Sequence, residues 1–131
     1  MQLENWNKID HLPLSYRHTV AVGEFRIRAR QAGFGWGEGS YKLEKVIPDV
    51  YYPQYRIAIE VDTGTESHDT LGSKGERYNG LSLQALAFIT TGPLERAETF
   101  FSRLEGVKYP IGATMENMDK VIKDLYDIRR G

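Results

Sequence analysis

The chain has 131 residues, enough for one domain that buries a core without disulfide or metal staples. Cysteine is absent, which excludes a disulfide scaffold, a Cys-ligated zinc site and a thiol nucleophile. A net charge of −1, from 17 basic and 18 acidic residues, excludes a polybasic nucleic-acid clamp. The longest apolar run is too short to span a bilayer and the N-terminus lacks a signal-peptide pattern, so we expect a cytoplasmic protein without a membrane partner.

The first half of the sequence predicts a helix, a loop and a hairpin. Residues 14–31 predict a helix because side chains recur at helical spacing: Val20, Glu24, Ile27 and Gln31. Alternating glycines then predict a flexible loop over 33–40. Residues 45–52 and 55–63 are rich in Val, Ile and Tyr and predict two strands of a hairpin, with a weaker strand over 40–44.

The second half predicts strands that alternate with helices. A helix is expected over 69–81, a fully covered strand over 85–91 and a short strand over 107–111. Two further helices are expected, one after Pro93 and one capped by Thr114. Their predicted buried stripes are Leu94, Ala97, Phe101 and Leu104 in the first, and Met118, Val121, Ile122, Leu125 and Ile128 in the second. The pattern predicts one α/β domain over 1–131, a mixed sheet with helices on both faces.

Acidic residues gather where the strands are expected. Residues 34–66 hold three basic and six acidic residues, a balance of 3 − 6 = −3. Asp49 and Glu60 fall on neighbouring strands, and Glu60 and Asp62 share one face of the second strand. Like charges on one face repel, so a cation is expected nearby, either a metal ion or a basic side chain. Carboxylate oxygens suit Mg²⁺, so Asp49 and Glu60 on neighbouring strands are predicted to bring two carboxylates to one metal ion.

Several short strings at this spacing resemble the nuclease-like portion of a known family. Pro48-Asp49 followed by Glu60-Val61-Asp62 is similar to the signature of the PD-(D/E)xK nuclease superfamily. The flanking residues narrow the resemblance to the replication-relaxation family of plasmids and mobile elements, from about residue 18 to 91. The strings that carry it are Arg17-His18-Thr19, Glu60-Val61-Asp62-Thr63-Gly64-Thr65-Glu66, Lys74 and Tyr78.

The resemblance implies a restriction-endonuclease-like fold and a DNA endonuclease or nicking domain that uses Mg²⁺ or Mn²⁺. It implies a role in the replication, relaxation or mobilisation of a plasmid or mobile element. Family members usually begin with a helix-turn-helix DNA-binding domain, for which this chain has no room. We therefore expect a fragment or a minimal stand-alone version, whose partners are DNA and either such a domain or a replication protein. A homodimer is a further option, because nuclease domains that cut both strands are often paired.

One departure from the superfamily pattern concerns its closing lysine, whose place is taken by Asp62. Three interpretations stay open. Lys74, on the following helix, supplies the ammonium from another backbone position; Asp62 acts as a third metal ligand; or hydrolysis has been lost and only the fold is kept. Lys74 and Tyr78 lie four residues apart and resemble the Gln-x-x-x-Tyr pair of RecB-like nucleases.

Other side chains are expected around this site. Glu24 matches a supporting position in the resemblance or is a solvated helix acid. His18 likewise matches a supporting position or is a capping or packing histidine. Glu66 is expected to be a solvated loop acid. Arg26 and Arg30, one helical turn apart, are expected to contact DNA phosphates or to form a solvated face.

The sequence thus predicts a metal-dependent DNA endonuclease with Asp49, Glu60, Asp62 and Lys74 as catalytic residues. The alternative is a catalytically silent domain of the same fold that binds DNA or a replication partner.

Overall fold

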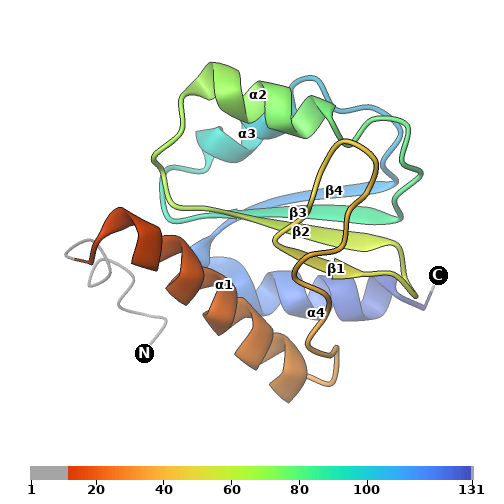
Figure 1. Ribbon diagram of the computed structural model, residues 1–131. Coiled ribbons are helices and arrows are strands. Elements are labelled where there is room, and N and C mark those ends of the chain that lie inside the picture. Colours follow the sequence, from red (N-terminus) through yellow and green to blue (C-terminus); the bar gives the residue numbers. More distant parts are fainter. Residues whose placement is uncertain (1–11, 131) are drawn as a thin grey trace.

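A computed structural model of the protein describes residues 12–130. In this part of the chain four α-helices, one short 3-10 helix and four strands follow one another (Figure 1). Their bounds are α1 (Leu14–Gln31), β1 (Val50–Tyr52), β2 (Ile57–Asp62), α2 (His68–Glu76), β3 (Ala85–Thr90), α3 (Glu95–Phe101), β4 (Tyr109–Thr114), η2 (Met115–Asn117) and α4 (Met118–Ile128).

The four strands form one open mixed sheet in the order β1-β2-β3-β4. β1 and β2 are antiparallel, with Val50 opposite Ile59, whereas β2, β3 and β4 run parallel. α2 and α3 cover one face of the sheet, and α1 and α4 cover the other (Figure 1). The predicted mixed α/β architecture with helices on both faces is therefore confirmed for residues 12–130.

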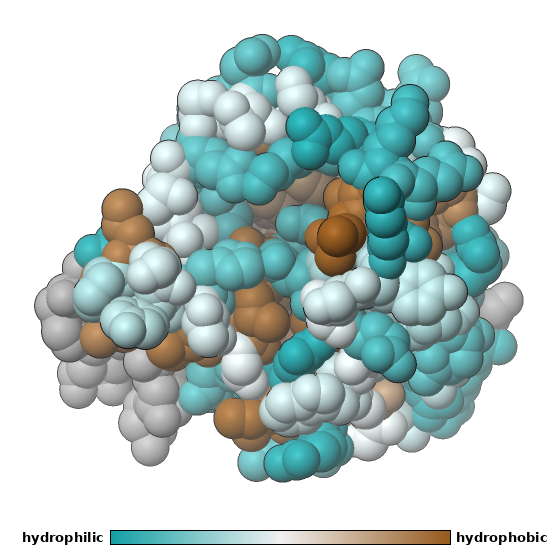
Figure 2. All heavy atoms as spheres, in the orientation of Figure 1, coloured by the Kyte–Doolittle hydropathy of each residue, from teal (hydrophilic) through white to brown (hydrophobic). Residues whose placement is uncertain are grey.

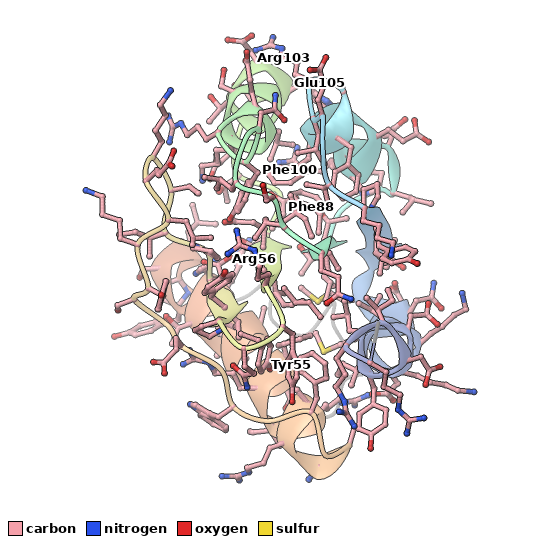
Figure 3. The ribbon with its side chains drawn as sticks, turned by 90° about the vertical axis from the view of Figure 1, so that its right-hand side faces the viewer. Tyr55, Arg56, Phe88, Phe100, Arg103 and Glu105 are labelled. Atoms are coloured by element: carbon pink, nitrogen blue, oxygen red, sulfur yellow. The ribbon has the colours of Figure 1, made fainter. Side chains whose placement is uncertain are left out.

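Two apolar clusters, one on each face, hold the layers together. Phe25 of α1, Ile59 of β2 and Leu125 of α4 belong to the first cluster. In the second, the rings of Phe88 and Phe100 stack with centroids 4.4 Å apart, between the sheet and α3 (Figure 3). Every residue of β3 is buried because helices cover both of its faces, which explains its unbroken apolar sequence.

The glycine-rich segment after α1 is a loop, as predicted, and hydrogen bonds join it to β1. Its Gly33, Gly35 and Gly37 all have positive φ, which side chains disfavour. The Tyr52 hydroxyl donates to the Gly35 carbonyl at 2.8 Å, and two backbone hydrogen bonds join Glu38 to Tyr51. The expected strand over 40–44 does not form; Leu43 pairs only with Val46 across a turn.

Several predicted boundaries and faces also differ. β1 starts at Val50 rather than 45, since Pro48 has no N–H to donate to a ladder. β2 starts at Ile57 rather than 55, because Arg56 adopts a positive φ in the hairpin turn. α2 ends at Glu76 rather than 81, and the first helix after Thr114 is the 3-10 segment.

The buried helix faces differ from prediction as well. α1 buries Ala21, Phe25 and Ala29 rather than the expected row, and Ile27 is exposed. α3 buries Phe100 more completely than Phe101, and Leu94 is exposed. In α1 the predicted residues Val20 and Glu24 lie one position before the buried Ala21 and Phe25, whereas in α3 the predicted burial of Ala97 is confirmed. The predicted face of α4 is confirmed at Met118, Val121, Ile122 and Leu125.

The surface agrees with a chain that keeps its apolar residues inside. On the face shown in Figure 2 hydrophobic residues form separate patches among hydrophilic ones. Within residues 12–130, none of the helices combines the length and apolarity needed to cross a bilayer.

The contact between α2 and α3 yields a stability prediction. A Cβ on Gly75 would lie 1.8 Å from the Phe100 carbonyl oxygen, so Gly75→Ala should force the two helices apart. We expect a loss of about 1–3 kcal/mol or more in the free energy of unfolding, measured by urea denaturation. Gly23→Ala is the matched control: a Cβ there meets nothing within 4 Å inside α1, so it should gain about 0.5–1 kcal/mol. Equal effects of the two changes would contradict this packing account.

Candidate active site

A cavity of about 280 Å³ opens where β2 and β3 end, beside the start of α1 and of α2. Asp62 and Thr90, the last residues of the two parallel strands, lie side by side in the ladder. In open α/β sheets the carboxyl ends of strands are the usual place for a ligand, because the following loops leave a crevice there. The three predicted acids, Asp49, Glu60 and Asp62, all line this cavity, together with His18 and Lys74.

Asp49 is held in place by the hairpin. Because Val50 pairs with Ile59, Asp49 comes next to Glu60 on the neighbouring strand. Its Oδ2 accepts a hydrogen bond of 2.7 Å from the Val61 N–H, which continues the ladder through a side chain. Its Oδ1 lies 3.1 Å from Nε2 of His18 on α1. The hydrogen bond to Asp49 raises the pKa of His18, so Asp49 gains a partial countercharge.

Among residues 12–130, no basic side chain forms an ion pair with Glu60. Its Oε1 accepts a hydrogen bond from the hydroxyl of Tyr78, which is itself buried. Burial and the neighbouring Asp49 carboxylate raise the pKa of Glu60 to about 8. Burial and the Glu60 charge likewise raise the pKa of Tyr78. Glu60 is therefore a carboxyl that keeps its proton at neutral pH unless a cation arrives.

Asp62 lies in a different environment. Arg96 of α3 donates to both of its carboxylate oxygens, at 2.7 and 3.1 Å, and Thr90 donates at 2.6 Å. Although burial opposes ionisation, the hydrogen bonds from Arg96 and Thr90 bring the pKa of Asp62 below its ordinary value. The cation beside Asp62 is therefore an arginine, one of the two kinds of cation expected from the repulsion between the acids, and the role of Asp62 as a third metal ligand stays a prediction.

Lys74 and Glu66 form an ion pair at the rim of the same cavity. The expectation that Glu66 is a solvated loop acid is wrong, because its side chain is only 31% exposed and its Oε2 is buried. Within residues 12–130, that Oε2 has no hydrogen-bond partner. Arg96 holds the loop in this position, since its Nη2 donates to the Glu66 carbonyl at 2.8 Å.

The carboxylates of the cavity are the candidate ligands for a metal ion. Among residues 12–130, no three His, Cys, Asp or Glu side chains are grouped so that they could hold a metal ion together. Asp49 and Glu60 both line the cavity, and among residues 12–130 neither of them forms an ion pair with a lysine or an arginine. Two carboxylates with water are a common Mg²⁺ site, because the small ion keeps most of its hydration.

The predicted supporting residues Tyr78 and Glu24 and the predicted DNA contacts Arg26 and Arg30 lie in different surroundings. Tyr78 lies two positions beyond α2 and reaches Glu60 from there rather than from the helix. Glu24 does not line the cavity; its carboxylate is 3.8 Å from the Arg28 guanidinium in α1. Arg26 and Arg30 approach the ring of Trp36, at 5.6 and 5.0 Å from its centroid.

Sequence reasoning missed Arg96, which neutralises Asp62, and Thr90, which donates a hydrogen bond to it. The repulsion between Glu60 and Asp62 predicts a nearby cation but does not identify the residue that supplies it, because Arg96 is 34 residues from Asp62 in the sequence. One local feature bears on Arg96: it directly precedes Ala97, a member of the predicted buried stripe of the helix after Pro93.

Comparison with known proteins identifies one matching family. The family model described as replication-relaxation matches residues 6–92. The match spans α1, the hairpin, α2 and β3, and so includes Asp49, Glu60, Asp62 and Lys74, whereas Arg96 lies beyond it. No curated protein and no solved structure matches the chain.

The Asp62–Arg96 pair yields a prediction about stability. Both side chains are less than 10% exposed, so Arg96→Ala leaves an uncompensated buried carboxylate. We expect a loss of about 3–5 kcal/mol in the free energy of unfolding, measured by urea denaturation. The control is Arg103→Ala, whose pair with Asp69 is exposed and should be worth about 0–1 kcal/mol. A loss for Arg96→Ala no larger than for this control would show that the buried pair does not organise the site.

Glu60 should make the protein less stable as the pH rises in the absence of metal. Its ordinary pKa is 4.5 and its folded-state pKa is about 8, so between these values the folded state holds a proton that the unfolded chain has lost. The contribution is fully present below pH 4.5 and declines up to pH 8, by at most about 1.4 kcal/mol per pH unit. Urea denaturation from pH 4 to 9 with a chelator measures it.

Two variants separate the titrating groups in this experiment. Glu60→Gln carries no titrating carboxyl, so its stability should vary less with pH than that of the parent. His18→Asn removes the imidazole, whose raised pKa gives stability that is lost in the same direction as the pH rises. Identical pH profiles for the parent and Glu60→Gln would contradict the assignment.

Proposed function

Because this chain belongs to the replication-relaxation family, we propose that its cavity binds the DNA backbone and hydrolyses a phosphodiester with Mg²⁺ or Mn²⁺. Family membership indicates a role in the replication or relaxation of a plasmid or mobile element. One observation carries the finer proposal: Glu60, a carboxyl without a countercharge of its own, lies beside Asp49 in a cavity that also contains an ammonium group, that of Lys74. A PD-(D/E)xK-like fold is part of this proposal, supported by the hairpin that carries Asp49 and Glu60.

The donor set supports a hard divalent cation. Asp49 and Glu60 would hold the ion, with water completing its coordination. A bound ion would replace the proton on Glu60. This would explain why the Glu60 carboxyl is costly to ionise when no ion is bound. When bound, Mg²⁺ or Mn²⁺ supplies a Lewis acid that polarises the phosphoryl group and acidifies water.

Basic side chains surround the carboxylates on the side away from α1. A second pocket, of about 330 Å³, is shared by Asp49 and Glu60 with four cations: Lys42, Lys45, Lys74 and Arg77. The net charge of −1 does not reveal this cluster of basic residues, because acidic residues elsewhere in the chain balance their charge. Phosphate contacts from such side chains position a nucleic-acid strand without reading its sequence. The pocket therefore supports a path for the backbone that passes the two acids.

Within this path Lys74 has a distinct role. Its ammonium group lines both pockets. The pKa values of Glu60 and His18 are raised overall, by burial and by the hydrogen bond to Asp49 respectively, and the positive charge of Lys74 opposes both rises. An ammonium there would stabilise the charge that develops on the phosphoryl oxygens. Glu66 holds the Lys74 ammonium at the rim, while Tyr78 orients Glu60 and His18 orients Asp49.

A second candidate function is a catalytically silent domain that binds DNA or a replication partner. The observation that favours it is the Asp62–Arg96 ion pair. Where the superfamily motif has a lysine, this chain has Asp62, whose carboxylate is neutralised by Arg96. The basic pocket would then serve binding alone. Cleavage and metal binding distinguish the two candidates.

Lys74→Ala should keep the fold and metal binding but lose about 10²-fold or more of cleavage rate. Asp49→Asn should lose both cleavage and the rise in melting temperature that Mn²⁺ gives to the parent. The measurements are nicking of supercoiled DNA and cutting of single-stranded DNA with Mg²⁺ or Mn²⁺, alongside thermal unfolding with and without the ion. Lys120→Ala, an exposed lysine on α4 across the sheet, is the matched control and should behave as the parent.

Two outcomes would decide against parts of the proposal. Undiminished cleavage by Lys74→Ala, with Asp49→Asn inactive, would place the chemistry on the acids and the ion and remove Lys74 from it. No cleavage by the parent, with no stabilisation by either ion, would favour the silent binding domain.

A further inference from the structure

A groove on the other side of Asp49 contains the exposed indole ring of Trp36. The groove has a volume of about 340 Å³ and is lined by α1 and by the glycine-rich segment that follows it. His18 and Asp49 line both this groove and the cavity, so the two lie next to each other. A volume near 300 Å³ lies at the lower end of the range for small-molecule sites, the scale of one nucleotide rather than of a duplex.

The backbone on either side of Trp36 is fixed, although 43% of the surface of this residue is exposed. Gly35 and Gly37 flank it with positive φ, and a Cβ on Gly37 would lie 2.5 Å from a methyl of Val50. The Tyr52–Gly35 and Glu38–Tyr51 hydrogen bonds pin the same segment to β1. An aromatic residue whose backbone is fixed in advance loses less conformational entropy when a partner stacks on its ring.

Two guanidinium groups accompany the ring, Arg26 at 5.6 Å and Arg30 at 5.0 Å from its centroid. No carboxylate of residues 12–130 forms an ion pair with either of them. The Nε of Arg26 is buried and lacks a hydrogen-bond partner within that range, and its guanidinium packs over the backbone of Gly39. These two positive charges beside a flat aromatic surface are complementary to a base and its phosphates.

We propose that Trp36, with Arg26 and Arg30, is a stacking platform for an unpaired base, so that the cavity acts on a single-stranded stretch of DNA. The inference rests on the proposed function, because it takes DNA as the ligand of the adjoining cavity. A base within a duplex already stacks on its neighbours, so it offers no free face to the ring. An unpaired base does, and its strand then continues past His18 and Asp49 into the cavity.

The test compares three probes in the presence of a chelator: a 15-residue oligothymidylate, an abasic chain of the same length and a 15-base-pair duplex. Fluorescence anisotropy of labelled probes gives each dissociation constant. The parent should bind the oligothymidylate about tenfold or more tightly than the abasic chain. Trp36→Ala should remove that difference and change abasic affinity by less than about twofold, while Trp36→Phe, which keeps a ring, should retain part of it.

A second readout follows the ring itself. The chain has two tryptophans, so Trp6→Phe makes Trp36 the sole reporter. Its fluorescence should be quenched by oligothymidylate and not by the abasic chain. Tyr109→Ala is the matched control, since Tyr109 is also 40% exposed beside a cation, Lys108, but lies on β4 at the far edge of the sheet. It should leave the preference for bases unchanged.

The outcomes separate this inference from the proposed function. If the parent binds all three probes equally and Trp36→Ala changes nothing, the platform is overturned while DNA binding stands. If base-dependent binding and quenching appear in a parent that never cuts DNA, the platform stands and the hydrolytic proposal fails. If none of the probes binds, both are overturned.

Discussion

The buried ion pair between Asp62 and Arg96 is the interaction on which the geometry of the site depends. It joins the end of β2 to α3, and Thr90 at the end of β3 completes it. Through the Glu66 carbonyl the same arginine also fixes the loop that leaves β2. A buried pair of this kind adds little net stability over an apolar contact, yet it is costly to break, so it specifies one arrangement of these elements.

This pair also explains why two acids two residues apart on one strand have opposite properties. Asp62 receives hydrogen bonds from Arg96 and Thr90, and its pKa falls below the ordinary value. Glu60 receives only the hydroxyl of Tyr78 and faces Asp49, so its pKa rises to about 8. The arrangement leaves one negative position satisfied within the protein and one that gains from an external cation. Such separation of neighbouring titratable groups is typical of functional sites.

Asp49 lies where three surfaces meet. The cavity, the basic pocket with Lys42, Lys45 and Arg77, and the groove with Trp36 all include it. The hairpin brings this about, since Asp49 ends the segment that crosses from α1 to β1 and is fixed there by the Val61 N–H. A strand of nucleic acid that meets the basic pocket and the groove would therefore have to pass the two carboxylates.

The sequence by itself determined the elements with strong local signals. Periodicity located α1 to the residue, the apolar run located β3, and the Pro-Gln connection between two Val- and Tyr-rich segments located the hairpin. Period-two alternation placed Glu60 and Asp62 on one face, and their repulsion called for a cation. These inferences succeed because the relevant distances are a few residues, over which backbone geometry is nearly fixed.

Only the tertiary structure decided which partner each charged group received. Arg96 reaches Asp62, Lys74 pairs with Glu66, and Tyr78 reaches Glu60 from beyond the end of α2. The same holds for the loop of alternating glycines, where positive φ values serve a docked conformation rather than mobility. Local patterns state which charges must be compensated, but compensation is set by which elements pack across the sheet, and that depends on the whole fold.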